Sequence, residues 1–215
     1  MIDYALDVLI IILSFFLFGL SHSVLASFKI KTIAAKWLGN YIAFYRLFYN
    51  IISVILVLLL YLYLPKPDLI VYDLSYPYDF LILIPQFLSL AGLIWSVKYI
   101  GLKQFLGLDQ AEQWFKNQYD VSQLDEKMTL TFDGPYKYVR HPIFLFGGLF
   151  ILFRPVMGLF YLTCVICIIL YIFIGSLYEE KRMIEKFGEK YIKYKKNVPG
   201  FFPYLFKPYK EDQNN

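Results

Sequence analysis

The stretch that decides the fold runs from Ile143 to Leu177 and reads IFLFGGLFILFRPVMGLFYLTCVICIILYIFIGSL. It is almost wholly apolar, and it is longer than the roughly 20 residues with which one helix crosses a ~30 Å hydrocarbon core. Pro155 removes a backbone donor and Gly158 permits a turn. The stretch therefore predicts a tight transmembrane helical hairpin with a short first arm.

Three more apolar blocks of about the same crossing length precede the hairpin: Ala5–Phe28, Phe44–Leu64 and Phe80–Ile100. With the hairpin they predict an all-α, polytopic membrane helix bundle of about five transmembrane helices. The first block lacks the basic residues that open a signal peptide, so we expect it to be retained. The composition agrees, because 59% of the residues are hydrophobic and 20% aromatic, well above soluble averages.

The basic residues predict the orientation. Five crossings place all but two of the 21 lysines and arginines on one side, and the exceptions are Lys66 and Arg154. The positive-inside rule then puts the N-terminus outside and the C-terminus in the cytosol. Basic loops beside an anionic inner leaflet account for the net charge of +4, so no nucleic-acid partner is expected.

The chain divides, by sequence, into a three-helix membrane module over residues 1–100 and a second part over residues 101–209. The second part contains a cytosolic segment, the hairpin and a C-terminal extension. Residues 210–215 are expected to be a disordered tail. The extension is amphipathic, since an aromatic and apolar stripe recurs at helical spacing in Met183, Phe187, Tyr191 and Tyr194. We expect it to lie on the membrane surface, a position that is compatible with covering a pocket that opens to the cytosol.

Metal chemistry is not expected. The two histidines, His22 and His141, are far apart in the chain. Cys164 and Cys167 have CxxC spacing but lie inside a lipid-spanning block, without the further ligands that a zinc site needs. We interpret both thiols as small apolar side chains.

Two polar segments flank the hairpin. Arg140 and His141 precede Pro142, which fits the first position of a helix. The free N–H groups of that helix and Arg140 form either an anion site or an ordinary cap with a snorkelling arginine. Glu179 and Glu180 end the second arm, where the helix dipole and mutual repulsion oppose them.

The carboxylate pair needs a cationic or hydroxyl-rich partner, which is either the adjacent Lys181 and Arg182 or a bound ligand. Because the hairpin is tight, we expect its two cytosolic ends to be neighbours. An anion holder beside two carboxylates suits a zwitterionic amino-acid tail attached to a nucleoside.

These residues resemble the C-terminal half of the isoprenylcysteine carboxyl methyltransferase superfamily over about residues 128–203. The shared motifs are Gly134-x-Tyr136-x-x-x-Arg140-His141-Pro142, Glu179-Glu180, Phe187-Gly188-x-x-Tyr191-x-x-Tyr194 and Val198-Pro199. Shorter motifs are similar to the methanethiol S-methyltransferase branch and to related denitrification-associated membrane proteins: Ser21 to Ala26, Phe105 to Gln110, and Ile174-Gly175. The resemblance implies a bacterial inner (cell) membrane location.

The resemblance also implies S-adenosylmethionine as the cofactor, bound on the cytosolic side. The contact positions that it implies are Tyr136, His141, Pro142, Ile143, Phe144 and Glu179, and the carboxylate pair adds Glu180. A second contact strip of the family aligns, with different residue types, to Met128, Thr129, Leu130 and Thr131. His141 and Arg140 are the candidate catalytic residues, although structural capping explains His141 equally well.

Two positions bear on the methyl acceptor. Gly175 stands where the prenylcysteine enzymes carry an arginine implicated in substrate handling, which argues against a prenylated substrate. Phe144 stands where many relatives have tyrosine, so one hydroxyl contact is lost. His22 is an ionisable residue at membrane depth and hence a candidate for lining the substrate pocket.

The sequence thus predicts methyl transfer to a small, membrane-permeable thiol such as methanethiol. A thiol with a pKa near ~8.5 supplies some thiolate without a strong base. The alternatives are a carboxyl methyltransferase that acts on prenylcysteine or another lipid-like acceptor, and a non-catalytic membrane accessory protein linked to denitrification. The sequence does not indicate an oligomeric state.

Overall fold

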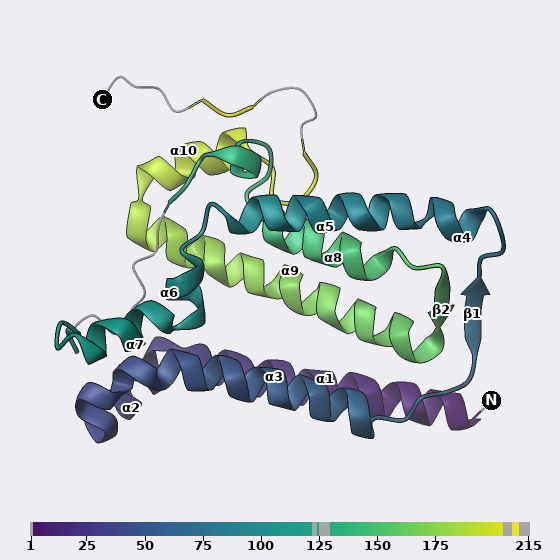
Figure 1. Ribbon diagram of the computed structural model, residues 1–215, viewed down its shortest axis with the longest axis horizontal. Coiled ribbons are helices and arrows are strands. Elements are labelled where there is room, and N and C mark those ends of the chain that lie inside the picture. The colour runs from purple at the N-terminus through teal and green to yellow at the C-terminus, as the bar shows by residue number, and fades with distance from the viewer. Residues whose placement is uncertain (1, 122–123, 125–129, 204–207, 211–215) are drawn as a thin grey trace. The chain divides into compact units, whose positions relative to one another are not determined.

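The computed structural model describes residues 2–121, 124, 130–203 and 208–210, and its helices dominate Figure 1. Two compact units form: Met1–Lys66 with Gly101–Thr129, and Pro67–Ile100 with Leu130–Asn215. This division follows spatial contacts rather than chain order. The division at residue 100 made from the sequence stays a prediction, and the tail predicted for residues 210–215 falls, beyond Lys210, outside the described residues.

The first unit is a pair of long antiparallel helices with shorter helices at one end. Its elements are α1 (Ile2–Ala26), α2 (Phe28–Leu38), the 3₁₀ helix η1 (Gly39–Phe44), α3 (Tyr45–Tyr63), α6 (Leu102–Leu106) and α7 (Leu108–Phe115). The hydroxyl of Tyr45, at the start of α3, donates to the carbonyl of Leu25, at the end of α1. Ser27 caps α2 by accepting from the N–H of Ile30, so a second helix begins directly after α1.

A glycine fixes α6 against α3. Gly107 has φ +87°, and a Cβ there would lie 2.6 Å from the backbone nitrogen of Leu47. Only glycine combines this left-handed conformation with so close an approach. Arg46 and Asn50 of α3 both donate to the carbonyl of Phe105, which satisfies an orphan acceptor at the end of α6.

The second unit is built on three antiparallel helices. Its elements are β1 (Ile70–Asp73), α4 (Tyr78–Leu81), α5 (Leu83–Val97), η2 (Gly134–Lys137), α8 (Pro142–Leu152), β2 (Val156–Gly158), α9 (Leu159–Phe187) and α10 (Glu189–Asn197). Gln86, early in α5, donates to the carbonyl of Phe150, late in α8. Tyr161, early in α9, donates to the carbonyl of Ile151. The predicted hairpin of α8 and α9 is therefore present, and α5 packs along its short arm (Figure 1).

A small sheet closes one end of this unit, which the sequence did not predict. β1 pairs antiparallel with β2, so that Ile70 faces Gly158 and Asp73 faces Val156. β1 precedes α4 and α5, and β2 follows α8. Because α5 and α8 run in opposite directions between the strands, both strands lie at the same end of the helices.

The chain is an all-α polytopic membrane helix bundle apart from these two strands. Within the described residues, four helical stretches are long and apolar enough to cross a membrane: Tyr4–Ala26, Phe28–Tyr63, Tyr78–Val97 and Leu159–Phe187. The remaining arm, α8, has 11 residues, or about 16 Å of helix at ~1.5 Å per residue. It is the short first arm expected from Pro155, which lies just beyond its end.

Candidate functional site

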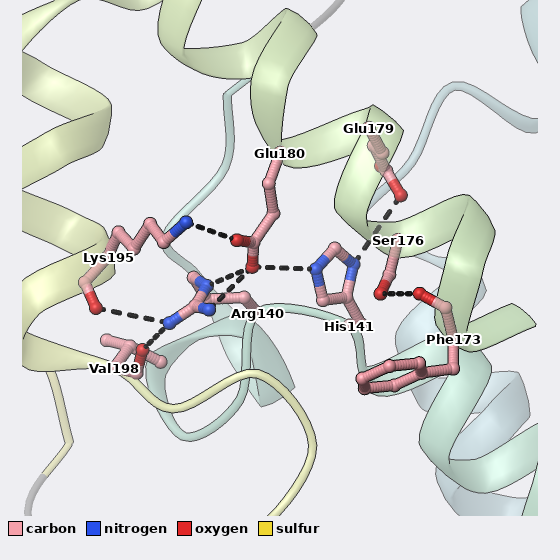
Figure 2. A network of polar contacts seen from close by, with 8 residues as sticks. All are labelled: Arg140, His141, Phe173, Ser176, Glu179, Glu180, Lys195 and Val198. Carbon is pink, nitrogen blue, oxygen red and sulfur yellow. Dashed lines mark hydrogen bonds and ion pairs between the residues drawn. The ribbon is translucent and has the colours of Figure 1, made fainter.

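The candidate site lies entirely within the second unit, at the end of the hairpin opposite the strands. Arg140 and His141 stand immediately before α8, which starts at Pro142. Glu179 and Glu180 lie in the last part of α9, and Lys195 projects from α10 (Figure 2). The expectation that the two ends of the hairpin are neighbours is confirmed by the contacts of these side chains.

Glu180 is the centre of the polar network. Its side chain is 7% exposed, and its Oε1 accepts from Arg140 Nε at 2.8 Å and from Arg140 Nη2 at 2.5 Å. The same oxygen lies 3.1 Å from His141 Nε2, and Oε2 lies 2.7 Å from Lys195 Nζ. A carboxylate this buried is stable only when its charge is paired and its oxygens are satisfied. Both conditions are met here, by Arg140 and His141 from the segment before α8 and by Lys195 from α10.

Lys195 is the member of this network that the sequence reading missed. It belongs to the amphipathic extension, in which the sequence singled out only the aromatic and apolar stripe. A signal was present, because Lys195 lies one residue after Tyr194 of the apolar stripe and so sits at the edge of the buried face.

Arg140 is committed to contacts inside the protein. Besides Glu180, its Nη1 donates to the carbonyls of Lys195, at 3.1 Å, and of Val198. Its side chain is 11% exposed. From the sequence, this guanidinium either forms part of an anion site or snorkels beside an ordinary helix cap; in the structure it ties the end of α10 to Glu180. A catalytic role for Arg140 stays a prediction, and its contacts suit a positioning role.

The backbone reinforces the same attachment. The N–H of Arg140 donates to the carbonyl of Pro199, and the N–H of His141 donates to the carbonyl of Gly200. Phe201 then stacks on the ring of His141. Residues 198–201, which we name the strap, therefore lie against the start of α8.

His141 is buried between aromatic rings and carboxylates. Its ring stacks on Phe144 at 5.6 Å and on Phe201 at 5.5 Å. Its Nδ1 lies 3.5 Å from Glu179 Oε2, while its Nε2 faces Glu180. Burial opposes a positive charge on the ring, but the hydrogen bonds and the charges of the two carboxylates outweigh it, so the pKa of His141 is raised.

The two carboxylates differ in exposure. Glu179 is 47% exposed, against 7% for Glu180. Glu180 is enclosed by cations of the protein, whereas one half of Glu179 remains accessible to a ligand. The two carboxylates therefore have different surroundings.

The other predicted cofactor positions surround this pair. Pro142 is buried, and Ile143 and Phe144 form the first turn of α8. The N–H groups of that turn have no intrahelical acceptor. The carbonyl of Tyr136 accepts from the hydroxyl of Tyr194 at 2.6 Å. Burial, with a contribution from Glu179, raises the pKa of the Tyr136 hydroxyl, so it stays protonated and able to donate.

The second predicted strip is only partly described. Met128 and Thr129 lie outside the described residues. Leu130 packs against the core beneath α10, which consists of Phe132, Tyr191, Tyr194 and Val198. The hydroxyl of Thr131 accepts from the N–H of Asp133. Cofactor contact at these positions stays a prediction.

The two predicted substrate residues lie in different units. Gly175 is on α9, and a Cβ there would meet no atom within 4 Å. His22 is on α1 of the first unit, where Nδ1 is 2.9 Å from Ser53 Oγ and Nε2 is 2.6 Å from Tyr49 Oη. These contacts explain a polar residue at membrane depth by helix–helix hydrogen bonding. Substrate roles for Gly175 and His22 stay predictions.

Comparison with known proteins finds relatives that are named as methanethiol S-methyltransferases. The chain is similar to methanethiol S-methyltransferase 1 of Bradyrhizobium diazoefficiens, with 30% identity over 206 residues, covering 92% of this chain and 67% of that protein. It is 31% identical over 130 residues to the methanethiol S-methyltransferase of Crocosphaera subtropica, covering 56% of this chain and 48% of the relative.

A third match, to the methanethiol S-methyltransferase of Pseudomonas deceptionensis, has 42% identity over 72 residues, covering 33% of this chain and 27% of that protein. The matches thus span about half the length of the Crocosphaera relative and two thirds of the Bradyrhizobium relative. No protein-family model matches the chain, and no solved structure matches it significantly.

Proposed function

Because this chain belongs to the methanethiol S-methyltransferase family, we propose that it is an integral membrane enzyme that transfers the methyl group of S-adenosylmethionine to a small thiol. Methanethiol is the proposed acceptor, since it is the substrate in the names of the relatives. The proposal places the N-terminus outside, and it places the C-terminus and the site on the cytosolic side of a bacterial inner membrane.

The observation that carries the proposal is the difference in exposure and in partners between Glu179 and Glu180. Glu180 is buried and neutralised by Arg140 and Lys195. Glu179, the preceding residue of α9, has an accessible carboxylate. An accessible carboxylate suits an ammonium group or ribose hydroxyls.

The remaining groups of the site complement that carboxylate. The free N–H groups at Ile143 and Phe144 begin α8, where the helix dipole favours an anion such as an amino-acid carboxylate. The protonated Tyr136 hydroxyl adds a donor. Donors and acceptors for a zwitterionic amino-acid tail and for a nucleoside therefore occur together, which is the chemistry that S-adenosylmethionine presents.

The reaction asks little chemistry of the protein. The bound sulfonium supplies an activated methyl group, and the thiolate sulfur forms a bond to that carbon as the original sulfur–carbon bond breaks. The acceptor loses its thiol proton to the solvent, and the products are the methylated thioether and S-adenosylhomocysteine. The residues of the site hold the donor in line with the acceptor, and such alignment is a large part of catalysis.

A paired experiment tests the proposal. Purified full-length protein in detergent is titrated with S-adenosylmethionine by calorimetry, and headspace gas chromatography measures dimethyl sulfide formed from methanethiol. Saturable binding together with product is expected. If the protein binds S-adenosylmethionine but methylates a prenylcysteine and not methanethiol, the methyl acceptor is a prenylcysteine and the thiol assignment is wrong. Absence of both binding and product would refute the proposal.

A further inference from the structure

His141 has a carboxylate at each of its two ring nitrogens. Nε2 lies 3.1 Å from Glu180 Oε1, and Nδ1 lies 3.5 Å from Glu179 Oε2. A neutral imidazole donates through one nitrogen and accepts through the other. Either neutral tautomer would therefore turn a lone pair towards an ionised carboxylate. Only the doubly protonated ring donates to both.

The surroundings hold the ring in this position. Phe144 and Phe201 both stack on it, with interplanar angles of 11° and 28°. The backbone N–H of His141 is fixed by the carbonyl of Gly200. The side chain is 4% exposed, so a rotation that exchanged carboxylate partners for water would have to displace packed rings.

The charges around the ring do not overturn this assignment. The facing carboxylates are Glu179 and Glu180, both from α9. The nearest cation, Arg140, donates to the same Glu180 oxygen that faces His141, so the shared oxygen lies between the two cations (Figure 2). Lys195, from α10, binds the other oxygen of Glu180. The buried tyrosines Tyr136 and Tyr191 have pKa values raised by burial and stay neutral.

From this geometry we infer that His141 is a positively charged positioning residue, which holds Glu179 in place for the methyl donor and does not act as a general base towards the thiol. This inference rests on the proposed function for the identity of the ligand. It leaves the acceptor to lose its proton to solvent, so that the thiolate fraction, which is the nucleophile, increases with pH.

The inference predicts a distinctive pH dependence. The Kd for S-adenosylmethionine should be low where His141 is protonated and should rise as the pH passes through the raised pKa of His141. Turnover should still increase with pH, because thiolate increases. A general base would behave differently, since kcat/KM for the thiol would then titrate with the pKa of His141 rather than with the pKa of the thiol.

The first test reads the protonation state directly and needs no activity. The chain contains two histidines, so ¹⁵N-histidine labelling of the intact protein gives two ring systems, which a His22→Gln variant assigns. We expect both nitrogens of His141 to be protonated at pH 7.5. We also expect Glu179→Gln to lower the pKa of His141, with Glu185→Gln as the matched control on the same helix. A neutral His141 ring at pH 7.5 would overturn the inference.

The second test separates positioning from base catalysis. His141→Gln should raise the Kd for S-adenosylmethionine about tenfold, as expected for the loss of a charged hydrogen bond. At saturating S-adenosylmethionine, the pH profile of this variant for methanethiol should keep the same shape as that of the wild type. Loss of an acidic limb in this variant would show a base and refute the inference. If wild type binds S-adenosylmethionine but methylates no thiol, the proposed function fails while the ¹⁵N result still stands.

Discussion

The guanidinium of Arg140 donates twice to a single carboxylate oxygen of Glu180, forty positions further along the chain. Its third nitrogen donates to carbonyls at Lys195 and Val198. One side chain thus joins the start of α8, the end of α9 and the end of α10. Arginine suits this place because its planar fork carries several donors in fixed directions.

Glu180→Gln should destabilise the protein more than Glu179→Gln does. Glu180 is buried with two cations, and breaking such a pair leaves Arg140 uncompensated, at a cost of about 3 kcal/mol in the free energy of unfolding. Glu179 is half-exposed and should contribute little to stability. Tryptophan fluorescence during denaturant unfolding in detergent measures the difference. Equal stabilities of the two variants would contradict the structural role of Glu180.

Glu179→Gln should instead weaken binding of S-adenosylmethionine by about tenfold, because a charged hydrogen bond to the ligand is lost. Calorimetry on the folded variant measures the Kd, and Glu185→Gln, an exposed residue two turns later on α9, provides the control. An unchanged Kd would mean that Glu179 does not contact the cofactor.

Arg140→Lys should loosen the strap without removing the positive charge. Lysine cannot reproduce donation to both Glu180 and the carbonyl of Val198. The N–H groups at positions 140 and 141, which donate to Pro199 and Gly200, should then exchange faster with deuterium. Hydrogen exchange with mass spectrometry measures this, with Arg182→Lys, exposed on α9, as control. Unaltered exchange at these amides would show that the backbone alone holds the strap.

The contribution of His141 to stability should decrease at alkaline pH. Its pKa is raised in the folded protein above the ordinary value of 6.5. The folded state therefore binds the proton more tightly than the unfolded state. The stabilisation is fully present below pH 6.5 and is lost as the pH rises through the raised pKa. The difference in melting temperature between wild type and His141→Gln should shrink over that range, and a constant difference would count against it.

Gly175→Arg should reduce methylation of methanethiol while leaving the Kd for S-adenosylmethionine within a few-fold of the wild type. Gly175 lies one helical turn before Glu179, on the same face, and has open space at its Cβ position. An arginine would fill that space on the proposed acceptor side, whereas Gly175→Ala adds one methyl group and should be tolerated. Full turnover in the arginine variant would remove Gly175 from the acceptor site.

The two strands make the topology testable at two separate loops. β1 pairs with β2, so residues 66–79 and the turn at Pro155 must lie on the same side of the membrane. Cysteine-accessibility labelling should report both from outside, and a reporter fused after Asn215 should report the cytosol. Opposite labelling of the two loops would contradict the strand pairing.

The sequence by itself determined the fold class, the hairpin and the family motifs. Long apolar blocks admit few structures, because a bilayer leaves backbone polar groups to be satisfied within helices. Pro155 and Gly158 marked the turn, and Pro142 marked the start of α8. These are local signals, which act through chain length and backbone conformation at single positions.

Only the tertiary structure decided which of the charged residues are buried and which partners they bind. Adjacent Glu179 and Glu180 look equivalent in sequence, yet successive side chains of an α-helix point about 100° apart. Glu180 therefore faces Arg140 and Lys195, while Glu179 is half-exposed. Lys195 and the carbonyl of Val198 reach Arg140 only because α10 folds back against the start of α8. Long-range packing sets burial and partners, and these determine whether a charge stabilises the fold or remains accessible to a ligand.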